Sequence, residues 1–166
     1  MKMIHLASPN SKSSLSKFDD DQVQPNAIDL RVDKIFQTYG QVFVISEEEK
    51  CHRESKEIIP TDGWWRLDVG SYEIIMDGII SVGAAEAGWV ITRSSLNRNG
   101  CFLTSGLYDS GYEGVMAGVL HINNGALRIK RGTRVGQFLL FKAEALNQYD
   151  GDYGVGKQHD QKYGES

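Results

Sequence analysis

The chain has 166 residues, of which 40% are hydrophobic and 24% are charged, so it is long enough for one domain with a real core. Its formal net charge of −4 gives no electrostatic reason to expect nucleic acid or an anionic membrane as a partner. We expect no membrane span, because no apolar run is long enough, and no signal peptide, because the N-terminus lacks its apolar segment.

The two cysteines, Cys51 and Cys101, do not form a CxxC pair. This usage favours the reducing cytoplasm as the location of the protein, although it leaves one disulfide open. The zinc-deaminase motifs H-x-E and P-C-x-x-C are absent from the sequence, so any deamination by this chain would be independent of metal. Cys51 and His52 are adjacent but lack further ligands, and a solvated loop over residues 47–53 is favoured over a metal site.

In chain order, the sequence begins with residues rich in serine, lysine and aspartate, and we expect residues 1–24 to form an exposed leader. Short strand-like runs follow at regular spacing, with little helical periodicity apart from one turn at residues 94–99. Gly70 and the sequence at 123–125 predict turns between neighbouring runs. The expected strands are residues 28–36, 41–45, 65–69, 72–76, 115–120, 126–129 and 135–141. This pattern predicts an all-β domain of the barrel or jelly-roll type.

The stretch from Thr92 to Leu120 carries the main chemical signal. Arg93, Ser94 and Ser95 form one polar cluster, and a forked guanidinium beside two hydroxyls suits phosphate oxygens. Asp109 begins a second cluster at a DSG turn, where a carboxylate can be presented at the end of a strand. Because an isolated RSS triplet is usually a surface cap or a solvated turn, the significance of the first cluster depends on the second.

Four short motifs extend this pattern along most of the chain. They are Asp29-Leu30, Arg93-Ser94-Ser95-Leu96 with Gly100, Asp109 with Tyr112 and Gly114, and Gly132 with Arg134 and Gln137. In this order they resemble the motifs of the trimeric dUTPase and dCTP deaminase superfamily. The resemblance implies a dUTPase-like distorted jelly-roll or β-barrel over residues 1–148, followed by a flexible Gly-rich tail over residues 149–166. It also implies a homotrimer, with the third motif of one chain completing the site of its neighbour.

The resemblance to the hydrolase branch implies conversion of dUTP and water to dUMP and pyrophosphate, with Mg²⁺ carried by the triphosphate. Asp109 would orient and deprotonate the attacking water, and Asp29 would hold the waters of the metal ion in its outer sphere. Asp29 also has a plain interpretation as a turn cap, and for Arg134 we favour a buried ion pair with Asp29 over contact with substrate. The residues expected to bind phosphate oxygens are Arg93, Ser94, Ser95 and Gln137.

The same resemblance implies how the nucleoside is held. Tyr112 would pack under the deoxyribose and leave no room for a 2′-hydroxyl. The main chain of Ser105, Gly106 and Leu107 would read the pyrimidine. A hairpin can favour uracil over cytosine in this way, because the two bases exchange donor and acceptor at the 4-position.

The tail partly matches the Gly-rich motif that closes over the substrate in the hydrolases. The matching segment is residues 151–157, with a tyrosine at the position of the family's phenylalanine and no preceding arginine. Tyr153 would stack on the pyrimidine, and Lys157 would reach the γ-phosphate as a point charge. A disordered tail without a role is the alternative.

Val119 separates the two branches of the superfamily. A deaminase needs a glutamate at this position, ten residues beyond Asp109, and a valine cannot shuttle protons. Ser94 and Arg98 match residues of the deaminase branch, and His121 could replace the missing acid, although a histidine of the core or an interface is favoured. The alternatives to a hydrolase are therefore a dCTP deaminase, alone or bifunctional, and a non-catalytic nucleotide-binding regulator on the same fold.

Overall fold

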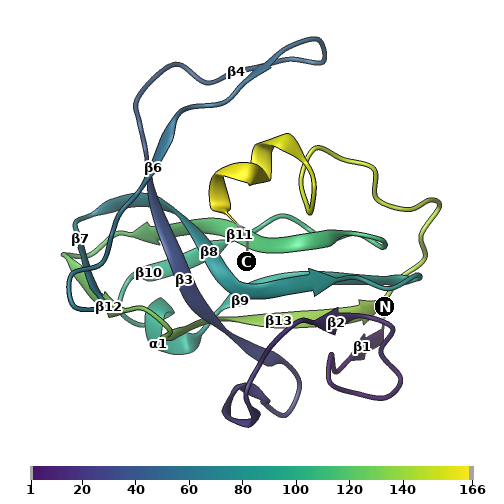
Figure 1. The fold of residues 1–166 in the computed structure, drawn as a ribbon. Helices are drawn as coiled ribbons and strands as arrows, with labels where there is room; N and C mark the ends of the chain where they lie inside the picture. Colours follow the sequence, from purple (N-terminus) through teal and green to yellow (C-terminus); the bar gives the residue numbers. More distant parts are fainter. Residues whose placement is uncertain (1, 165–166) are drawn as a thin grey trace.

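The computed structural model describes residues 2–164, which are mainly strands, as the sequence predicts. One nine-stranded sheet runs in the order β1-β13-β3-β8-β11-β10, with β2, β6 and β9 paired beside it, and it curls around itself (Figure 1). Its strands are β1 (Lys2–Ile4), β2 (Ser14–Leu15), β3 (Ile28–Thr38), β6 (Ser55–Glu57), β8 (Gly70–Ser81), β9 (Glu86–Thr92), β10 (Cys101–Thr104), β11 (Glu113–Ile122) and β13 (Arg134–Lys142). No helix within residues 2–164 has the length and apolar character needed to cross a membrane.

The remaining elements are short and lie at the margins of the sheet. Two small antiparallel pairs join β7 to β12 and β4 to β5. The elements are β4 (Val44–Ile45), β5 (Lys50–Cys51), β7 (Trp64–Leu67), β12 (Leu127–Lys130), α1 (Ser94–Asn97), and the 3-10 helices η1 (Asp20–Gln22) and η2 (Gln158–Tyr163). The one helical turn expected near residues 94–99 is therefore confirmed as α1.

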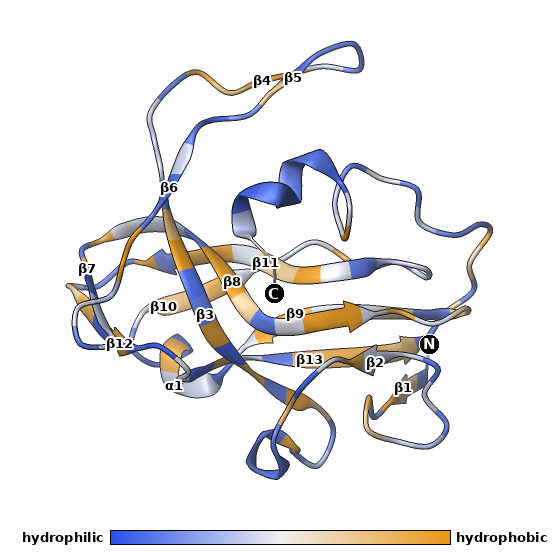
Figure 2. Cartoon of the chain, in the orientation of Figure 1, coloured by the Kyte–Doolittle hydropathy of each residue, from blue (hydrophilic) through white to orange (hydrophobic). Residues whose placement is uncertain are grey.

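The core lies inside the curled sheet, and the period of two along β3 explains which residues reach it (Figure 2). Ile28, Leu30 and Val32 are at most 1% exposed and pack in the core. A register shift between Val32 and Lys34 then changes the alternation, as a β-bulge does. As a result Ile35 faces the core, whereas Phe36 joins a second apolar cluster on the other side of the strand.

The N-terminal segment is not the exposed leader that its composition predicts. β1 pairs with β13 and β2 pairs with β8, so both add strands to the sheet. Leu6 and Leu15 are buried in the core. The expectation was wrong because these isolated leucines lie among serines and lysines, and a pattern based on composition gives single apolar residues little weight.

A buried carboxylate fixes this segment to the sheet. Glu86 is 0% exposed and accepts hydrogen bonds from the Lys12 amide at 3.0 Å and from the Ser13 hydroxyl at 2.6 Å. Lys142 Nζ lies 2.5 Å from Glu86 Oε1. Burial alone would raise the pKa of Glu86, but the Lys142, Ser13 and Lys12 hydrogen bonds outweigh it and hold that pKa below its ordinary value.

Two expected turns do not form hairpins. β7 pairs with β12, and β8 pairs with β3, β11 and β2, so Gly70 separates two strands that are not neighbours. Gly125 has a φ of +65°, as a turn residue, but β11 and β12 are not paired with each other either. The strands beside each turn pair with strands that are distant in sequence. The local sequence at a turn therefore does not reveal which strands pair.

Two segments extend beyond the sheet and lie near each other. Residues 39–54, here called the arm, contain β4 and β5 and stand out from the sheet (Figure 1). Residues 149–164, here called the tail, run back along the sheet and end in η2. The tail was expected not to be ordered by packing, yet Tyr163 is only 3% exposed and meets the Phe36 ring edge-on at 5.7 Å. Tyr149 also packs against the core, with its ring 5.3 Å from that of Tyr112, so two aromatic side chains supply apolar surface to a largely polar segment.

Candidate active site

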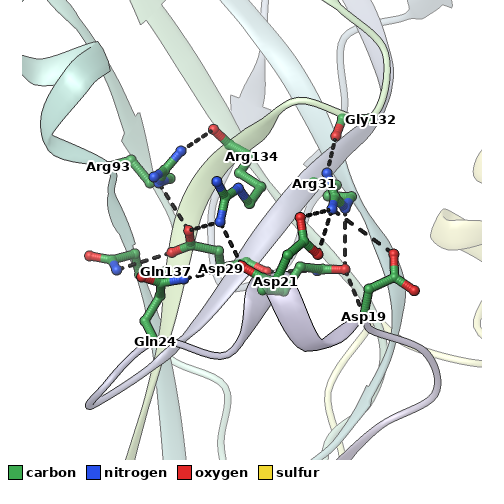
Figure 3. Close-up of polar contacts among 10 residues, drawn as sticks. Asp19, Asp21, Gln24, Asp29, Arg31, Arg93, Gly132, Arg134 and Gln137 are labelled. Carbon is green, nitrogen blue, oxygen red and sulfur yellow. Dashed lines mark hydrogen bonds and ion pairs between the residues drawn. The ribbon is translucent and has the colours of Figure 1, made fainter.

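Asp29 is the centre of a polar cluster built by β9, β13 and β3 (Figure 3). The register places Gln137 opposite Asp29, and Gln137 Nε2 donates to Asp29 Oδ1 at 3.1 Å. Arg93 Nε lies 3.2 Å from Asp29 Oδ2, and Arg134 Nη1 lies 3.4 Å from the same oxygen. The ion pair expected between Arg134 and Asp29 is thus confirmed, whereas the contact of Arg93 with Asp29 was not expected.

The cluster has more positive than negative charge, because two guanidinium groups share one carboxylate. Asp29 is 0% exposed, and neither contact to its Oδ2 is aligned as a hydrogen bond. The side chains of Arg93 and Arg134 are each 30% exposed, so both retain donors that face solvent. Ser94 and Ser95 follow as exposed residues at the start of α1. Cations and hydroxyls therefore converge where a phosphate group could bind.

Residues of the N-terminal segment form hydrogen bonds with the residues of this cluster and with the neighbouring Arg31. Gln22 Nε2 donates to the Asp29 carbonyl at 2.8 Å, and Arg31 Nη2 donates to both oxygens of the Asp21 carboxylate, at 2.7 and 2.9 Å. Arg134 Nη1 also donates to the Asp21 carbonyl at 2.6 Å. The sequence analysis missed Asp21 and Gln22 because it placed them in an exposed leader. Their only signal is a run of aspartate and glutamine shortly before Asp29.

A cavity of about 850 Å³ lies beside β8 and β11, between the arm and the tail. Four of the residues expected to bind the nucleoside line it, namely Gly106, Leu107, Tyr112 and Tyr153. Tyr112 is buried and donates its hydroxyl to the Val115 carbonyl at 2.7 Å. Burial raises the pKa of Tyr112, so its ring is a neutral and fixed wall of the cavity.

The loop between β10 and β11 presents its main chain to this cavity. Ser105 Oγ donates to the Gly106 carbonyl at 3.0 Å, and the Tyr108 amide and carbonyl both pair with Gly88 at 2.8 Å. The Gly106 and Leu107 amides make no hydrogen bond to another part of residues 2–164. Leu107 is 61% exposed. The loop is therefore fixed at both ends, with free N–H groups between them, as main-chain recognition of a base requires.

The tail approaches the same cavity through its glycines. Gly154 has a φ of +118°, and a Cβ on it would come within 2.5 Å of the Glu113 carbonyl, so only glycine fits there. Tyr153 lines the cavity and is 38% exposed. Lys157 does not line it, and its Nζ lies 3.7 Å from Asp150 Oδ1.

Asp109 belongs to neither group of site residues. It is exposed at a turn, where its carbonyl accepts from the Tyr112 amide at 3.0 Å and Gly111 has a φ of +86°. Within residues 2–164 it makes no hydrogen bond or ion pair to the Asp29 cluster, and it does not line the cavity. One chain thus gathers a phosphate-type cluster and a nucleoside-type cavity, with Asp109 apart from both.

Val119 forms part of the cavity wall, opposite Thr104 on one side and Glu73 on the other. His121, two residues further along β11, is engaged at both ring nitrogens, each 3.0 Å from a hydroxyl of Ser71 or Thr104. These contacts favour the structural interpretation of His121. Three carboxylates line the cavity, Glu73, Asp152 and Asp160, and of these Glu73 lies opposite Val119 on β8. The sequence does not single out Glu73, because a lone glutamate on a strand has no distinctive spacing.

The part of the chain covered by the structure does not build a metal cage. Among residues 2–164, no three side chains of the histidine, cysteine, aspartate or glutamate type gather closely enough to hold a metal ion. Both cysteines are free thiols; Cys51 is exposed and Cys101 is buried.

The chain is similar in sequence to known proteins. The dCTP deaminase-like domain family matches residues 3–143. A probable deoxyuridine 5'-triphosphate nucleotidohydrolase of Halobacterium salinarum is 33% identical over 140 residues, covering 81% of this chain and 84% of the relative. The deoxyuridine 5'-triphosphate nucleotidohydrolase of Methanocaldococcus jannaschii is 30% identical over 152 residues, covering 89% of this chain and 97% of the relative.

Two solved structures have the same fold. The 2'-deoxycytidine 5'-triphosphate deaminase of Agrobacterium tumefaciens superposes with a TM-score of 0.63 at 18% identity, covering 82% of this chain but only 45% of that chain. A mutant dUTPase of Staphylococcus bacteriophage 80alpha, solved with dUpNHpp, has a TM-score of 0.53 at 11% identity, covering 86% of this chain and 97% of that chain. At these identities the likeness concerns the fold alone.

Proposed function

The chain belongs to the dUTPase and dCTP deaminase superfamily, and from this premise we propose that it is a dUTP diphosphatase, which hydrolyses dUTP to dUMP and pyrophosphate. The observation that carries the choice of branch is Val119 in the wall of the cavity, since the deaminase branch places a glutamate there. The two relatives described above, which are 33% and 30% identical, are named as nucleotidohydrolases, in agreement with this choice.

Each part of the substrate has a matching group on the chain. The triphosphate would lie against Arg93, Ser94, Ser95 and Gln137, because the cluster around Asp29 has a surplus of positive charge. The deoxyribose would pack on Tyr112, and the free amides of Gly106 and Leu107 would read the base. Ser105 sets the conformation of that loop through its bond to the Gly106 carbonyl. Tyr153 would stack on the base, and Lys157 would exchange Asp150 for the γ-phosphate when the substrate is bound.

Asp109 is the group we assign to the attacking water. Its exposure at a rigid turn leaves its carboxylate free to orient a water and accept its proton, and no cation of residues 2–164 pairs with it. For this role Asp109 must meet a triphosphate that is bound elsewhere on the same chain or on a neighbour.

A homotrimer would solve this problem. Within one chain the Asp29 cluster and the cavity are separate, and Asp109 lies apart from both. If sites form between subunits, the Asp109 turn and cavity of one chain can face the Asp29 cluster of the next chain, and each site then uses residues of two subunits. Light scattering should give three times the mass of the 18.5 kDa chain, and a monomer at micromolar concentration would contradict this assembly.

We propose Mg²⁺ as the cofactor, carried by the triphosphate. The donor set suits an outer-sphere ion, because the cluster offers one carboxylate, Asp29, whose Oδ2 lacks an aligned hydrogen bond. Asp29 would hold waters of the ion after Arg93 turns toward phosphate. The ion would neutralise part of the negative charge of the triphosphate. We also propose a cytoplasmic location, since Cys51 is an exposed free thiol.

Incubation with dUTP, dCTP and dTTP in the presence of Mg²⁺, followed by chromatography of the products, tests the function. We expect dUMP and pyrophosphate from dUTP alone. Formation of dUTP from dCTP would instead identify a deaminase and overturn the argument from Val119. Binding without turnover of any of the three nucleotides would identify a regulator on this fold.

A further inference from the structure

The arm and the tail are far apart in sequence but touch through a small group of side chains. Lys50 Nζ of the arm lies 2.6 Å from Asp152 Oδ2 of the tail. The His52 ring of the arm lies 4.6 Å from the His159 ring of the tail, and the Tyr153 ring meets His159 edge-on at 4.9 Å. Figure 1 shows the arm standing over the tail at this place.

Few other contacts fix the position of the arm. β4 and β5 pair only with each other, and every residue from 39 to 54 is exposed. Phe43 of the arm stacks on His52 at 5.9 Å, so the ring that touches the tail is itself supported. Phe43, His52 and Arg53 line the same cavity as Tyr112 and Leu107.

The tail is also anchored at three places outside the arm: the Tyr149 amide donates to the Ser110 carbonyl at 2.8 Å, the Val155 amide donates to the Glu113 carbonyl of β11 at 2.9 Å, and η2 is held by β8. The Tyr163 hydroxyl donates to Glu73, and Lys162 Nζ lies 2.9 Å from the same carboxylate. The backbone of Tyr153 lies between the first two of these anchors, but its side chain is not held by the sheet and the residue is 38% exposed. The Tyr153 ring packs edge-on against His52 and His159, so its orientation at the cavity depends on the contacts of residues 152–159 with the arm.

We propose that the arm is a holder for the tail, in which Lys50 and His52 are positioning residues that keep Tyr153 at the mouth of the nucleoside cavity. The proposal rests on the proposed function, because the cavity is taken to bind the base and sugar of a deoxynucleoside triphosphate. It adds a second segment of the chain to the site, and no motif of the superfamily recognised in the sequence includes that segment.

The histidine pair makes this contact sensitive to acid. Partial desolvation of the ring, then His159, Lys50 and Lys162, lower the pKa of His52, while Asp152 opposes them. Other charged groups at this place are Arg53, which also lines the cavity, and Asp160, whose Oδ1 lies 3.0 Å from His159 Nδ1. The stacked arrangement therefore favours a neutral His52.

The direction of the pH effect follows from linkage. With the pKa of His52 lowered when arm and tail are in contact, the contact binds fewer protons than the separated segments do. Its stability is fully present above the ordinary histidine pKa of about 6.5 and is lost as the pH falls below that value. The tail should separate from the arm in mild acid while Tyr163 remains on the sheet.

Hydrogen exchange of the full-length protein, read by mass spectrometry and corrected for the intrinsic rate, measures this separation. Between about pH 7.5 and about pH 5.5 we expect protection of residues 149–157 to fall by roughly threefold or more, while peptides of β11 keep theirs. His52→Phe keeps a stacked ring that cannot bind a proton, so its tail should stay protected in acid. The control His121→Gln removes a histidine outside the contact and should behave as the wild type.

The Lys50→Met variant distinguishes the contribution of the Lys50–Asp152 ion pair from that of His52 protonation. Because exposed pairs of this kind are weak, we expect its tail to lose roughly two- to fivefold protection at every pH while keeping the acid response. At neutral pH the same variant should raise KM for dUTP by a similar factor and leave kcat unchanged, as expected of a residue that positions a binding group.

The results separate the two proposals. Absence of dUTP hydrolysis would defeat the proposed function, while the exchange measurement would still decide whether the arm holds the tail. A His52→Phe variant that loses tail protection in acid as the wild type does would overturn the role of His52. Unchanged protection in Lys50→Met would overturn the role of the arm.

Discussion

The Asp29 cluster and the nucleoside cavity are built by different means. The cluster is made by strand register, since Gln137 is opposite Asp29 in a ladder and the arginines come from the ends of adjacent strands. The cavity takes its floor from β8 and β11 but its walls from the arm and the tail, which contact each other through exposed side chains. The comparison indicates that charge for the phosphates is fixed in advance, whereas enclosure of the base depends on weak contacts that can open.

The largest effect, on the free energy of unfolding, is expected from a substitution in the Asp29 cluster. Asp29→Asn leaves Arg93 and Arg134 without their counter-charge, and loss of one member of a buried ion pair costs about 3–5 kcal/mol. The partial exposure of both arginines places the expected loss near the lower limit. Urea unfolding measures it, and a variant as stable as the wild type would show that the cluster does not contribute to the fold.

The second effect should change turnover without changing stability. Asp109→Asn removes the proposed general base from an exposed turn and should lower kcat by a factor of roughly 10² or more. The unfolding midpoint and the affinity for dUTP should stay near the wild-type values. Near-normal turnover would remove Asp109 from the mechanism and leave the attacking water without a base among the residues named above.

The third effect tests the movable region. Tyr153→Ala removes a ring that lines the cavity, and stacking of an aromatic side chain on a base contributes about 1–3 kcal/mol. We expect weaker dUTP binding by calorimetry with little change in stability. Tyr153→Phe is the matched control, because it keeps the ring and should bind as the wild type does.

The smallest effect should come from an exposed pair next to the fixed region. Asp21→Asn breaks the contact with Arg31, but the Asp21 side chain is 56% exposed and such pairs are worth about 1 kcal/mol or less. Its backbone bond to Arg134 remains. Measured beside Asp29→Asn by urea unfolding, it shows how far burial determines the value of an ion pair in this cluster. Equal losses in the two variants would contradict that interpretation.

Features that depend on a periodic pattern or on a short local motif can be predicted well from the sequence. Alternation of apolar residues predicts the strand that begins at Ile28, and the resemblance to the superfamily leads us to expect the ion pair of Arg134 with Asp29. Leu15 was missed because a single leucine in a polar segment has no period, and its partner strand lies about 65 residues away. The contact of His52 with His159 was missed for the same reason, since neither residue has a distinctive neighbour and they meet only after the arm and tail fold.

The pairing of β1 with β13 has a consequence for how the protein is made. Lys2 to Ile4 find their partners at Leu140 to Lys142, so the sheet closes through a contact that spans nearly the whole chain. Such high contact order is typical of domains that fold in milliseconds to seconds. During synthesis β1 cannot pair until β13 has left the ribosome, so closure of the sheet is a late step of folding. Until then β1 and β9 would lack the partner strand β13 and present open edges, and overproduction at low temperature should favour soluble product over aggregates.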